Sequence, residues 1–274
     1  MKNYFLQRVS HVVVAAFLAV MLFAGVSVAN AAEPKLDDKW HFTLIPYIWL
    51  PSVDGEMNVD HSGGIGSSNI DIGSSSYMDN LQFAAMFSLE VEKGRWSLLS
   101  DFAYVDFSDD SREATFKRFP GVEIDGETEL EAMIFEIAGA YSLYRSERAR
   151  FDVLGGIRYI GIDGKVSYDV STPLPFNLPS RSFSDDVDYV DPIIGVKGRF
   201  ELGKHWFVPY YADMGGFGIN DEFNWQAFGG IGYHFSELFS MVLGYRHLEY
   251  DFHDDKLIKD LSLSGGQLGF VFRF

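Results

Sequence analysis

Six histidines lie beyond residue 31, and they are the first side chains to consider for acid–base chemistry: His41, His61, His205, His234, His247 and His253. An acyl-transfer site needs a nucleophile, a base within hydrogen-bonding reach and a group that orients the base. His247 is the best candidate base, because Glu249 follows two residues later and shares its face of an extended strand. No nucleophile motif is recognisable around His247, so a histidine with no catalytic role is the simpler interpretation.

The sequence predicts no metal site and no cofactor. Cysteine is absent, which excludes disulfides, thiolate metal ligands and a cysteine nucleophile. Acidic pairs at 109–110, 185–186 and 254–255 lack the ligand spacing of a calcium loop, and solvated loops explain them simply. The alternative is a divalent-cation site at these pairs. Glycine-rich pieces at 215–218 and 229–232 precede neither a helix nor a phosphate-binding lysine, so they indicate crowded strand positions.

The elements that must position these residues are about ten segments in which apolar and polar residues alternate with the strand period of two. Ten residue steps of about 3.3 Å, tilted by about 40°, span roughly 25 Å, which is the height of a lipid-facing band. Aromatic residues make up 16% of the chain, and such a content fits strands with aromatic girdles. The segments are 40–50, 81–92, 95–107, 127–144, 150–162, 188–202, 205–219, 222–236, 238–250 and 261–274.

Connections between the segments alternate between short and long, as periplasmic turns and extracellular loops do in outer-membrane barrels. We therefore predict an all-β fold, an antiparallel transmembrane β-barrel of about ten strands that occupies residues 32–274. Eight or twelve strands remain possible, twelve if residues 54–60 and 65–72 enter the wall. The last strand should close the barrel against the strand that begins at Trp40. A soluble sandwich or lipocalin-like barrel is the alternative, and it would carry its apolar face inside.

Charged residues collect on the polar face of these segments, opposite the apolar one. An arginine at the lipid midplane would cost about 2 to 4 kcal/mol, so these side chains should face the lumen. The predicted lumen-facing charges are Glu90, Asp101, Glu136, Asp152, Arg158, Asp191, Lys197, Arg199, Asp213, Arg246 and Arg273. They either pair across strands and fill the barrel, or they line a narrow path for small solutes and set its selectivity.

The two ends of the chain carry targeting signals. Lys2 and Arg8 precede an apolar run, and an A-x-A arrangement ends at Ala31, so residues 1–31 read as a cleaved secretory signal peptide. Its removal lowers the formal net charge from -17 to -19, because two bases are lost. At the other end Gln267, Gly269, Phe272 and the terminal Phe274 resemble the C-terminal signal by which outer-membrane barrels are recognised for assembly.

These features predict a location and a set of partners. The expected location is the outer membrane of a Gram-negative bacterium, in contact with outer-membrane lipids and lipopolysaccharide. During biogenesis the chain should meet periplasmic chaperones and the β-barrel assembly machinery. Nucleic acid is excluded as a partner, because so acidic a protein lacks the basic surface that phosphate binding requires.

Several short pieces occur in an order that resembles one family. They are Pro46-Tyr47-Ile48-Trp49, Val53-Asp54-Gly55, Lys93-Gly94-Arg95-Trp96, Asp213-Met214-Gly215-Gly216-Phe217-Gly218 and Gly244-Tyr245-Arg246. Together with the terminal phenylalanine they resemble a widespread, largely uncharacterised family of proteobacterial outer-membrane barrel proteins. The resemblance implies a fold and a location, but no substrate or catalytic residue. His247 departs from the pattern, since a tyrosine is expected there.

The function expected from the sequence is that of an integral outer-membrane barrel, structural or porin-like, with a charged lumen that is either filled or open to small solutes. Its alternative is a lipid-modifying enzyme with a site at the membrane rim near His247. The sequence leaves the enzyme question open and favours a protein without catalytic activity.

Overall fold

Every secondary-structure element among the described residues is a β-strand, and all of them belong to one antiparallel sheet. The computed structural model describes residues 38–61, 64–72, 81–109, 123–171, 181–217, 223–251 and 258–274. No helix in these ranges is long and apolar enough to cross a membrane. The strands are β1 (Trp40–His61), β2 (Gly64–Ile72), β3 (Leu81–Lys93), β4 (Trp96–Asp109), β5 (Glu123–Arg145), β6 (Ala149–Ser171), β7 (Arg181–Glu201), β8 (Trp206–Gly215), β9 (Phe223–His234), β10 (Phe239–Asp251) and β11 (Ile258–Arg273).

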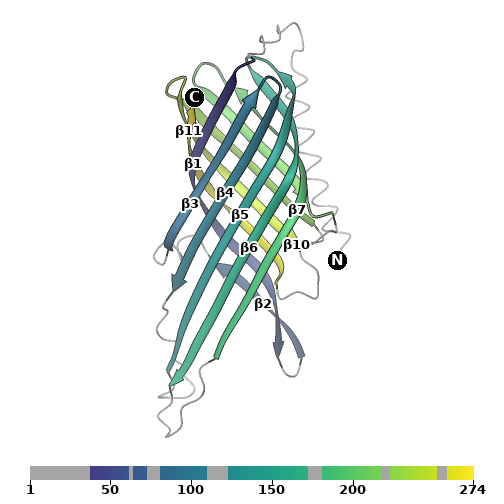
Figure 1. Cartoon of the computed structure of the whole chain (residues 1–274). Helices are drawn as coiled ribbons and strands as arrows, with labels where there is room; N and C mark the ends of the chain where they lie inside the picture. The colour runs from purple at the N-terminus through teal and green to yellow at the C-terminus, as the bar shows by residue number, and fades with distance from the viewer. Residues whose placement is uncertain are drawn as a thin grey trace. The chain divides into compact units, whose positions relative to one another are not determined.

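Ten of these strands close into a barrel (Figure 1). Each strand from β3 to β11 is hydrogen-bonded to the next, and β1 completes the ring by pairing with β3 and with β11. In the described part of the chain β2 pairs with β1 alone, from Val53↔Ile72 to His61↔Gly64. The hairpin of β1 and β2 therefore extends the sheet without adding to the ring. The predicted all-β barrel of about ten strands is confirmed.

The seam between β1 and β11 joins the two ends of the described chain. The two strands pair from Thr43↔Arg273 to Met57↔Ile258. At one end of the seam the Phe42 amide donates to the Phe274 carbonyl at 3.1 Å, and the Phe274 amide donates to the Phe42 carbonyl at 2.9 Å. The last strand therefore closes the barrel against the first, as the sequence predicts.

Strands β5, β6 and β7 are longer than the segments predicted for them. They contain 23, 23 and 21 residues, because β5 and β6 pair from Glu123↔Ser171 to Arg145↔Arg150, and β7 follows β6 to Tyr168↔Arg181. The predicted loops 108–126 and 163–187 are thus partly sheet. Branched and aromatic residues such as Ile124, Val166 and Val170 continue the alternation into these polar stretches and favour extended backbone.

Short turns define one end of the barrel, which we call the short-turn end, and the far tips of β5, β6 and β7 define the long-strand end (Figure 1). Gly94 and Gly203 lie in two of the short turns with φ of 61° and 102°. Glycine adopts this left-handed backbone without the clash that a Cβ would cause, so these turns can stay tight. Phe274 lies at the same end.

The outer face of the barrel carries a broad apolar band. Leu98, Ile157, Ile194, Ile231 and Leu243 all point outward, and each is between 46% and 61% exposed. Toward the short-turn end, contacts between aromatic rings run across neighbouring strands, with centroids 4.9, 4.9, 5.6 and 5.2 Å apart in the series Trp206, Tyr233, Phe235, Phe239 and Phe272. A water-soluble barrel would bury such a surface rather than expose it.

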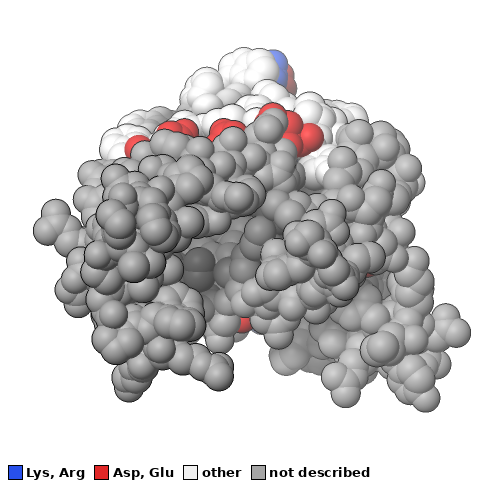
Figure 2. Space-filling view, turned by 90° about the horizontal axis from the view of Figure 1, so that it is seen from below, with Lys and Arg blue, Asp and Glu red and all other residues white. Residues whose placement is uncertain are grey.

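The band gives way to acidic residues toward the long-strand end. Glu131, Asp163 and Asp188 are exposed there, and the Tyr104 hydroxyl donates to Glu131 at 3.4 Å. Seen from this end, acidic side chains lie among uncharged ones along one side of the described surface (Figure 2). The outer wall therefore has an apolar middle and a polar, acidic margin at the long-strand end.

Gly265 provides a test of the seam. A Cβ added at Gly265 would lie 2.0 Å from the Leu50 carbonyl oxygen, whereas one added at the neighbouring Gly266 meets nothing within 4 Å. We expect Gly265→Ala to lower the free energy of unfolding by about 1 to 3 kcal/mol, because β1 and β11 must move apart. Gly266→Ala, the matched control, should change it by less than about 0.5 kcal/mol. Urea unfolding of the refolded barrel, followed by tryptophan fluorescence, measures both, and equal effects would contradict the close approach.

Candidate functional site

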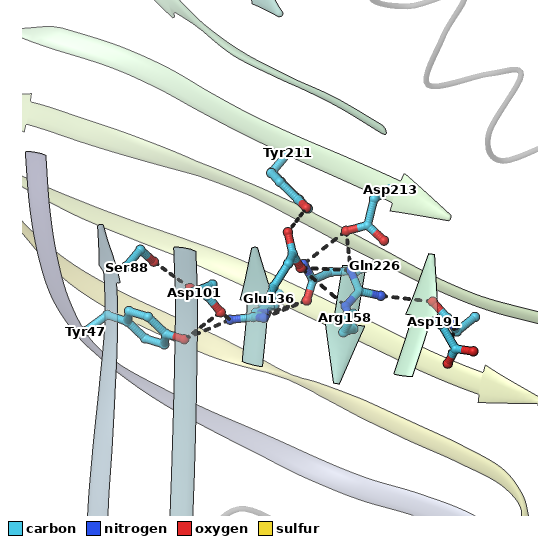
Figure 3. A network of polar contacts seen from close by, with 11 residues as sticks. Tyr47, Ser88, Asp101, Glu136, Arg158, Asp191, Tyr211, Asp213 and Gln226 are labelled. Atoms are coloured by element: carbon cyan, nitrogen blue, oxygen red, sulfur yellow. Dashed lines mark hydrogen bonds and ion pairs between the residues drawn. The ribbon is translucent and has the colours of Figure 1, made fainter. Parts of the chain in front are cut away.

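Arg158 on β6 is fully buried at the centre of the barrel interior (Figure 3). Its Nε and Nη2 donate to Glu136 Oε2 on β5 at 3.3 and 3.1 Å, and Nη2 also donates to Asp213 on β8. Its Nη1 donates to Asn224 Oδ1 on β9 at 3.0 Å. Because β8 and β9 are not neighbours of β6 in the sheet, these bonds cross the lumen.

Arg246 on β10 forms a second crossing. Its Nε and Nη2 donate to Gln226 Oε1 at 2.9 and 2.6 Å, and its Nη1 lies 3.0 Å from both the Tyr47 hydroxyl and Asp101 Oδ1. The guanidinium carbon also lies 4.7 Å from the Trp49 ring centroid, within the range of a cation–π contact. Asp101 is on β4, so this arginine joins opposite parts of the wall.

Polar side chains connect the two arginines into one structure, which we call the central network. The Gln226 amide nitrogen donates to Asp213 at 3.3 Å and so links the partners of Arg246 and Arg158. Tyr47 and Ser88 donate to Asp101 at 3.0 and 2.5 Å, Tyr211 donates to Glu136, and the Asn224 amide nitrogen donates to Asp191 at 3.3 Å. The network comprises Tyr47, Ser88, Asp101, Glu136, Arg158, Asp191, Tyr211, Asp213, Asn224, Gln226 and Arg246, from β1 and β3 through β10.

A second group of charges lies nearer the short-turn end, and we call it the short-turn cluster. Lys197 on β7 donates to Glu90 on β3 at 2.5 Å, and Arg150 on β6 lies 3.4 Å from the same carboxylate. Arg150 also bonds to Glu92 and, at 2.6 Å, to Asp152, while Arg145 lies 2.6 Å from Glu92. The short-turn cluster thus consists of three bases and three acids, Arg145, Arg150, Lys197, Glu90, Glu92 and Asp152.

An apolar layer lies next to the central network on the side of the long-strand end. Ile134, Ile160 and Leu248 are the next inward residues after Glu136, Arg158 and Arg246, and they are 4%, 1% and 0% exposed. They pack in one cluster with Tyr47, Trp49, Ala103, Tyr250 and Leu261. Side chains around a water-filled passage would be exposed to solvent, so burial of this layer and of both arginines means that the lumen is filled at these levels.

The predicted lumen-facing charges occupy different positions within this arrangement. Seven of them are buried: Glu136, Asp152, Arg158, Asp191, Lys197, Asp213 and Arg246. Two more are partly buried, Asp101 in the central network and Glu90 in the short-turn cluster. Arg199 and Arg273 lie apart, near the short-turn end: Arg199 pairs with Glu201 at 2.8 Å with its side chain 42% exposed, and Arg273 donates to Ser240 at 2.9 Å. Of the residues in the predicted assembly signal, Phe272 and Phe274 are exposed outside, while Gln267 and Gly269 have the inward parity.

Sequence reasoning missed the five uncharged members of the central network, which are Tyr47, Ser88, Tyr211, Asn224 and Gln226. Asn224 and Gln226 lie on the polar face of the alternating segment 222–236, and Tyr211 shares the parity of Asp213, so the pattern could have identified these three. Arg150 and Glu92 were missed for another reason. They lie at the ends of their segments, where the sequence alone does not separate a strand end from a turn.

His247 lies on the outer face, where the pairing of β10 with β11 places it directly opposite Ser264. Its Nδ1 is 2.5 Å from the Ser264 hydroxyl, and its Nε2 is 3.2 Å from Glu249 Oε2. The indole nitrogen of Trp225 donates to the same glutamate oxygen at 3.0 Å, and the Trp225 ring packs against the imidazole with centroids 4.5 Å apart. The sequence identified His247 and Glu249 but not Ser264, because the register of the two strands is needed to bring it near.

Two further predictions concern residues that the structure covers only in part. The signal peptide at 1–31 lies outside the described residues, as do Asp110 and the acidic pair at 254–255. Asp185 and Asp186 lie on β7. Among the residues that the structure describes, no group of three or more histidine, aspartate or glutamate side chains could hold a metal ion.

Comparison with known proteins finds outer-membrane β-barrels of related fold. The outer membrane protease OmpT from Escherichia coli is 11% identical and aligns with a TM-score of 0.50 over 89% of this chain and 100% of that chain. The translocator domain of autotransporter NalP from Neisseria meningitidis is 12% identical, with a TM-score of 0.42 over 98% of each chain. Ail of Yersinia pestis, in complex with the heparin analogue sucrose octasulfate, is 12% identical, with a TM-score of 0.34 over 87% of this chain and 100% of that chain.

No family model matches the chain, and no curated protein matches it. At 11% identity, the likeness to OmpT shows a shared fold alone.

Removal of Arg158 tests the central network. Arg158→Met should lower the free energy of unfolding by about 3 to 5 kcal/mol, because Glu136 and Asp213 would remain buried without a counter-charge. Adding Glu136→Gln and Asp213→Asn should restore much of the loss. The control Arg199→Met, whose parent side chain is 42% exposed, should cost less than about 1 kcal/mol. Urea titration of refolded protein measures all three, and similar losses at Arg158 and Arg199 would contradict the role of the network.

Proposed function

We propose that this protein is an integral barrel of a Gram-negative outer membrane, with a lumen closed by its own side chains and a structural rather than solute-conducting role. The observation that carries this proposal is the central network, in which Arg158 and Arg246 cross the lumen while the outer wall remains apolar. Charges inside and an apolar band outside are the distribution that a lipid environment requires.

The surface of the outer wall supports the membrane location. The exposed apolar band covers the wall between the aromatic rings of the short-turn end and the acidic margin of the long-strand end. The short turns would then face the periplasm, and the partners would be outer-membrane lipids, lipopolysaccharide and, during biogenesis, periplasmic chaperones and the assembly machinery. We also infer that the chain belongs to the proteobacterial outer-membrane barrel family that its short motifs resemble.

The filled lumen favours a structural protein over a narrow channel. A conducting pore needs a continuous wet passage with ion binding weak enough to allow release. Here the central network and the apolar layer of Ile134, Ile160, Leu248 and Tyr250 are buried across the barrel. An ion would have to break buried ion pairs at one level and pass through a buried apolar layer at the next.

Planar-bilayer recording tests the closed lumen. The refolded wild-type protein should insert without discrete conductance steps, since the described side chains of the apolar layer are buried. A gel-shift assay for the folded barrel confirms that the inserted protein is native. Steps whose ion selectivity changes in Arg246→Gln would show a conducting lumen and overturn this part of the proposal.

The terminal phenylalanine tests the location and the assembly signal together. Phe274→Ala keeps the backbone bonds to Phe42 and removes only the exposed ring, so it should refold in detergent like the wild type. In cells it should reach the outer-membrane fraction at a several-fold lower level, because the recognition signal is damaged. Ser262→Ala on the same strand is the matched control. Equal outer-membrane levels for all three proteins would refute the signal, and absence of the wild type from that fraction would refute the location.

A further inference from the structure

The outer face around His247 is laid out in rows by the register of β1, β11, β10 and β9. In one row Ser52, Ser264, His247 and Ala227 stand side by side. The next row toward the long-strand end contains Asp54, Ser262, Glu249 and Trp225. In the other direction the rows are Leu50, Gly266, Tyr245 and Gly229, and then Ile48, Leu268, Leu243 and Ile231. The wall thus changes from polar to apolar at the row that holds Ser264 and His247.

The contacts of His247 have the arrangement of an activated nucleophile. In the tautomer that carries its proton on Nε2, the imidazole donates to Glu249 at 3.2 Å and accepts the Ser264 hydroxyl proton on Nδ1 at 2.5 Å. Glu249 is itself held by the Trp225 indole at 3.0 Å. A nucleophile, a base and an orienting group within hydrogen-bonding distance are the components that acyl-transfer chemistry needs, whichever fold supplies them.

We propose that Ser264, His247 and Glu249 form a site that hydrolyses the fatty acyl esters of membrane lipids. The lipid substrate rests on the membrane location proposed above, whereas the hydrolytic chemistry does not. Ser264 and His247 are the catalytic residues, and Glu249 is a positioning residue that acts through the imidazole.

The reaction proceeds in two balanced steps. The Ser264 oxygen attacks the ester carbonyl carbon while His247 takes the hydroxyl proton, and the C–O bond to the alcohol breaks as His247 returns that proton to the leaving oxygen. Water, deprotonated by the same imidazole, then attacks the acyl-serine, releases the fatty acid and restores the Ser264 hydroxyl. The oxyanion needs a hydrogen-bond donor, and Ser52, which pairs with Ser264 on the other side in the row, carries a hydroxyl.

The depth of the site matches the ester level of a lipid. Eight residue steps along β10 lead from the aromatic Phe239 to His247. At about 3.3 Å each and tilted by about 40°, they rise about 20 Å, which places His247 close to the long-strand edge of a lipid-facing band about 25 Å high. Acyl esters lie at this boundary between hydrocarbon and head groups. An acyl chain bound at Ser264 would therefore extend along the apolar rows toward the short-turn end.

Glycines leave room for that chain beside the serine. Gly266 follows Ser264 on the outward face of β11, and Gly229 lies beyond Tyr245 in the same row. A Cβ added at either position would meet nothing within 4 Å, so the wall is open there. Leu243 and Ile231, which are 61% and 46% exposed, continue the apolar surface toward the short-turn end.

The experiment uses the full mature chain refolded in detergent, with folding verified by gel shift. A fluorophosphonate probe should modify Ser264, as located by mass spectrometry, and a p-nitrophenyl fatty acyl ester should be hydrolysed. Ser264→Ala and His247→Ala should each lower kcat by at least about 1000-fold while remaining folded. Glu249→Gln should lower kcat by more than about 10-fold with little change in KM, because it misplaces the base without touching the substrate.

Two controls and two lipids complete the design. Ser262→Ala, on the same strand face but opposite Glu249, and His205→Ala, at the short-turn end, should keep the wild-type rate. Phosphatidylglycerol vesicles and purified lipopolysaccharide, tested separately for fatty acid release, identify the lipid source. Absence of Ser264 modification, or ester hydrolysis that survives in Ser264→Ala, overturns the site. Because the ester assay needs no outer membrane, its failure leaves the proposed location intact, and mislocalised protein would leave the ester result intact.

Discussion

A guanidinium taken out of water is tolerated only when its charge and its donors are matched, and this requirement governs the barrel. Burial of an ion costs several kcal/mol even after the surroundings relax. Arg158 meets the requirement with groups from β5, β8 and β9, and Arg246 with groups from β1, β4 and β9. A slip of one residue in any of these strands would turn the partner outward and leave a buried charge unmatched. The network therefore specifies the register of the wall as well as occupying its interior.

Much of the fold follows from the sequence, because one physical rule dominates it. In a closed sheet every second side chain faces inward, so the alternation around Phe83, Phe87 and Leu89 predicts strand, face and environment at once. The closure of the last strand against the first follows from an even strand count. The lengths of β5, β6 and β7 do not follow, because polar alternation such as 163–171 suits an exposed loop and a paired strand equally well.

The candidate sites depend on contacts that the alternation of inward and outward side chains does not predict. Parity indicates which side of the wall a residue occupies, and the structure places Glu136, Arg158 and Asp213 inside on that parity. It does not indicate which residues meet across the lumen, since Lys197 and Glu90 lie 107 residues apart and on strands that are not neighbours. For the same reason, parity could not identify Ser264 as the neighbour of His247 on the outer face. Its distance from His247 along the chain carries no information until the hairpin register is fixed.

Arg246 and His247 are consecutive residues on opposite faces of β10, and this adjacency joins the interior to the outer wall. The bonds of Arg246 to Gln226, Tyr47 and Asp101 hold its stretch of backbone at a fixed height and rotation. The position of the adjacent His247 is fixed by the same backbone. Strand β11 pairs with β10 and places Ser264 opposite His247, and no flexible loop is involved. The conformational entropy of bringing these groups together is therefore lost during folding rather than at each encounter with a ligand. The buried side chains of the interior therefore act as a rigid support, and their packing fixes the geometry of the residues on the outer face of the same strands.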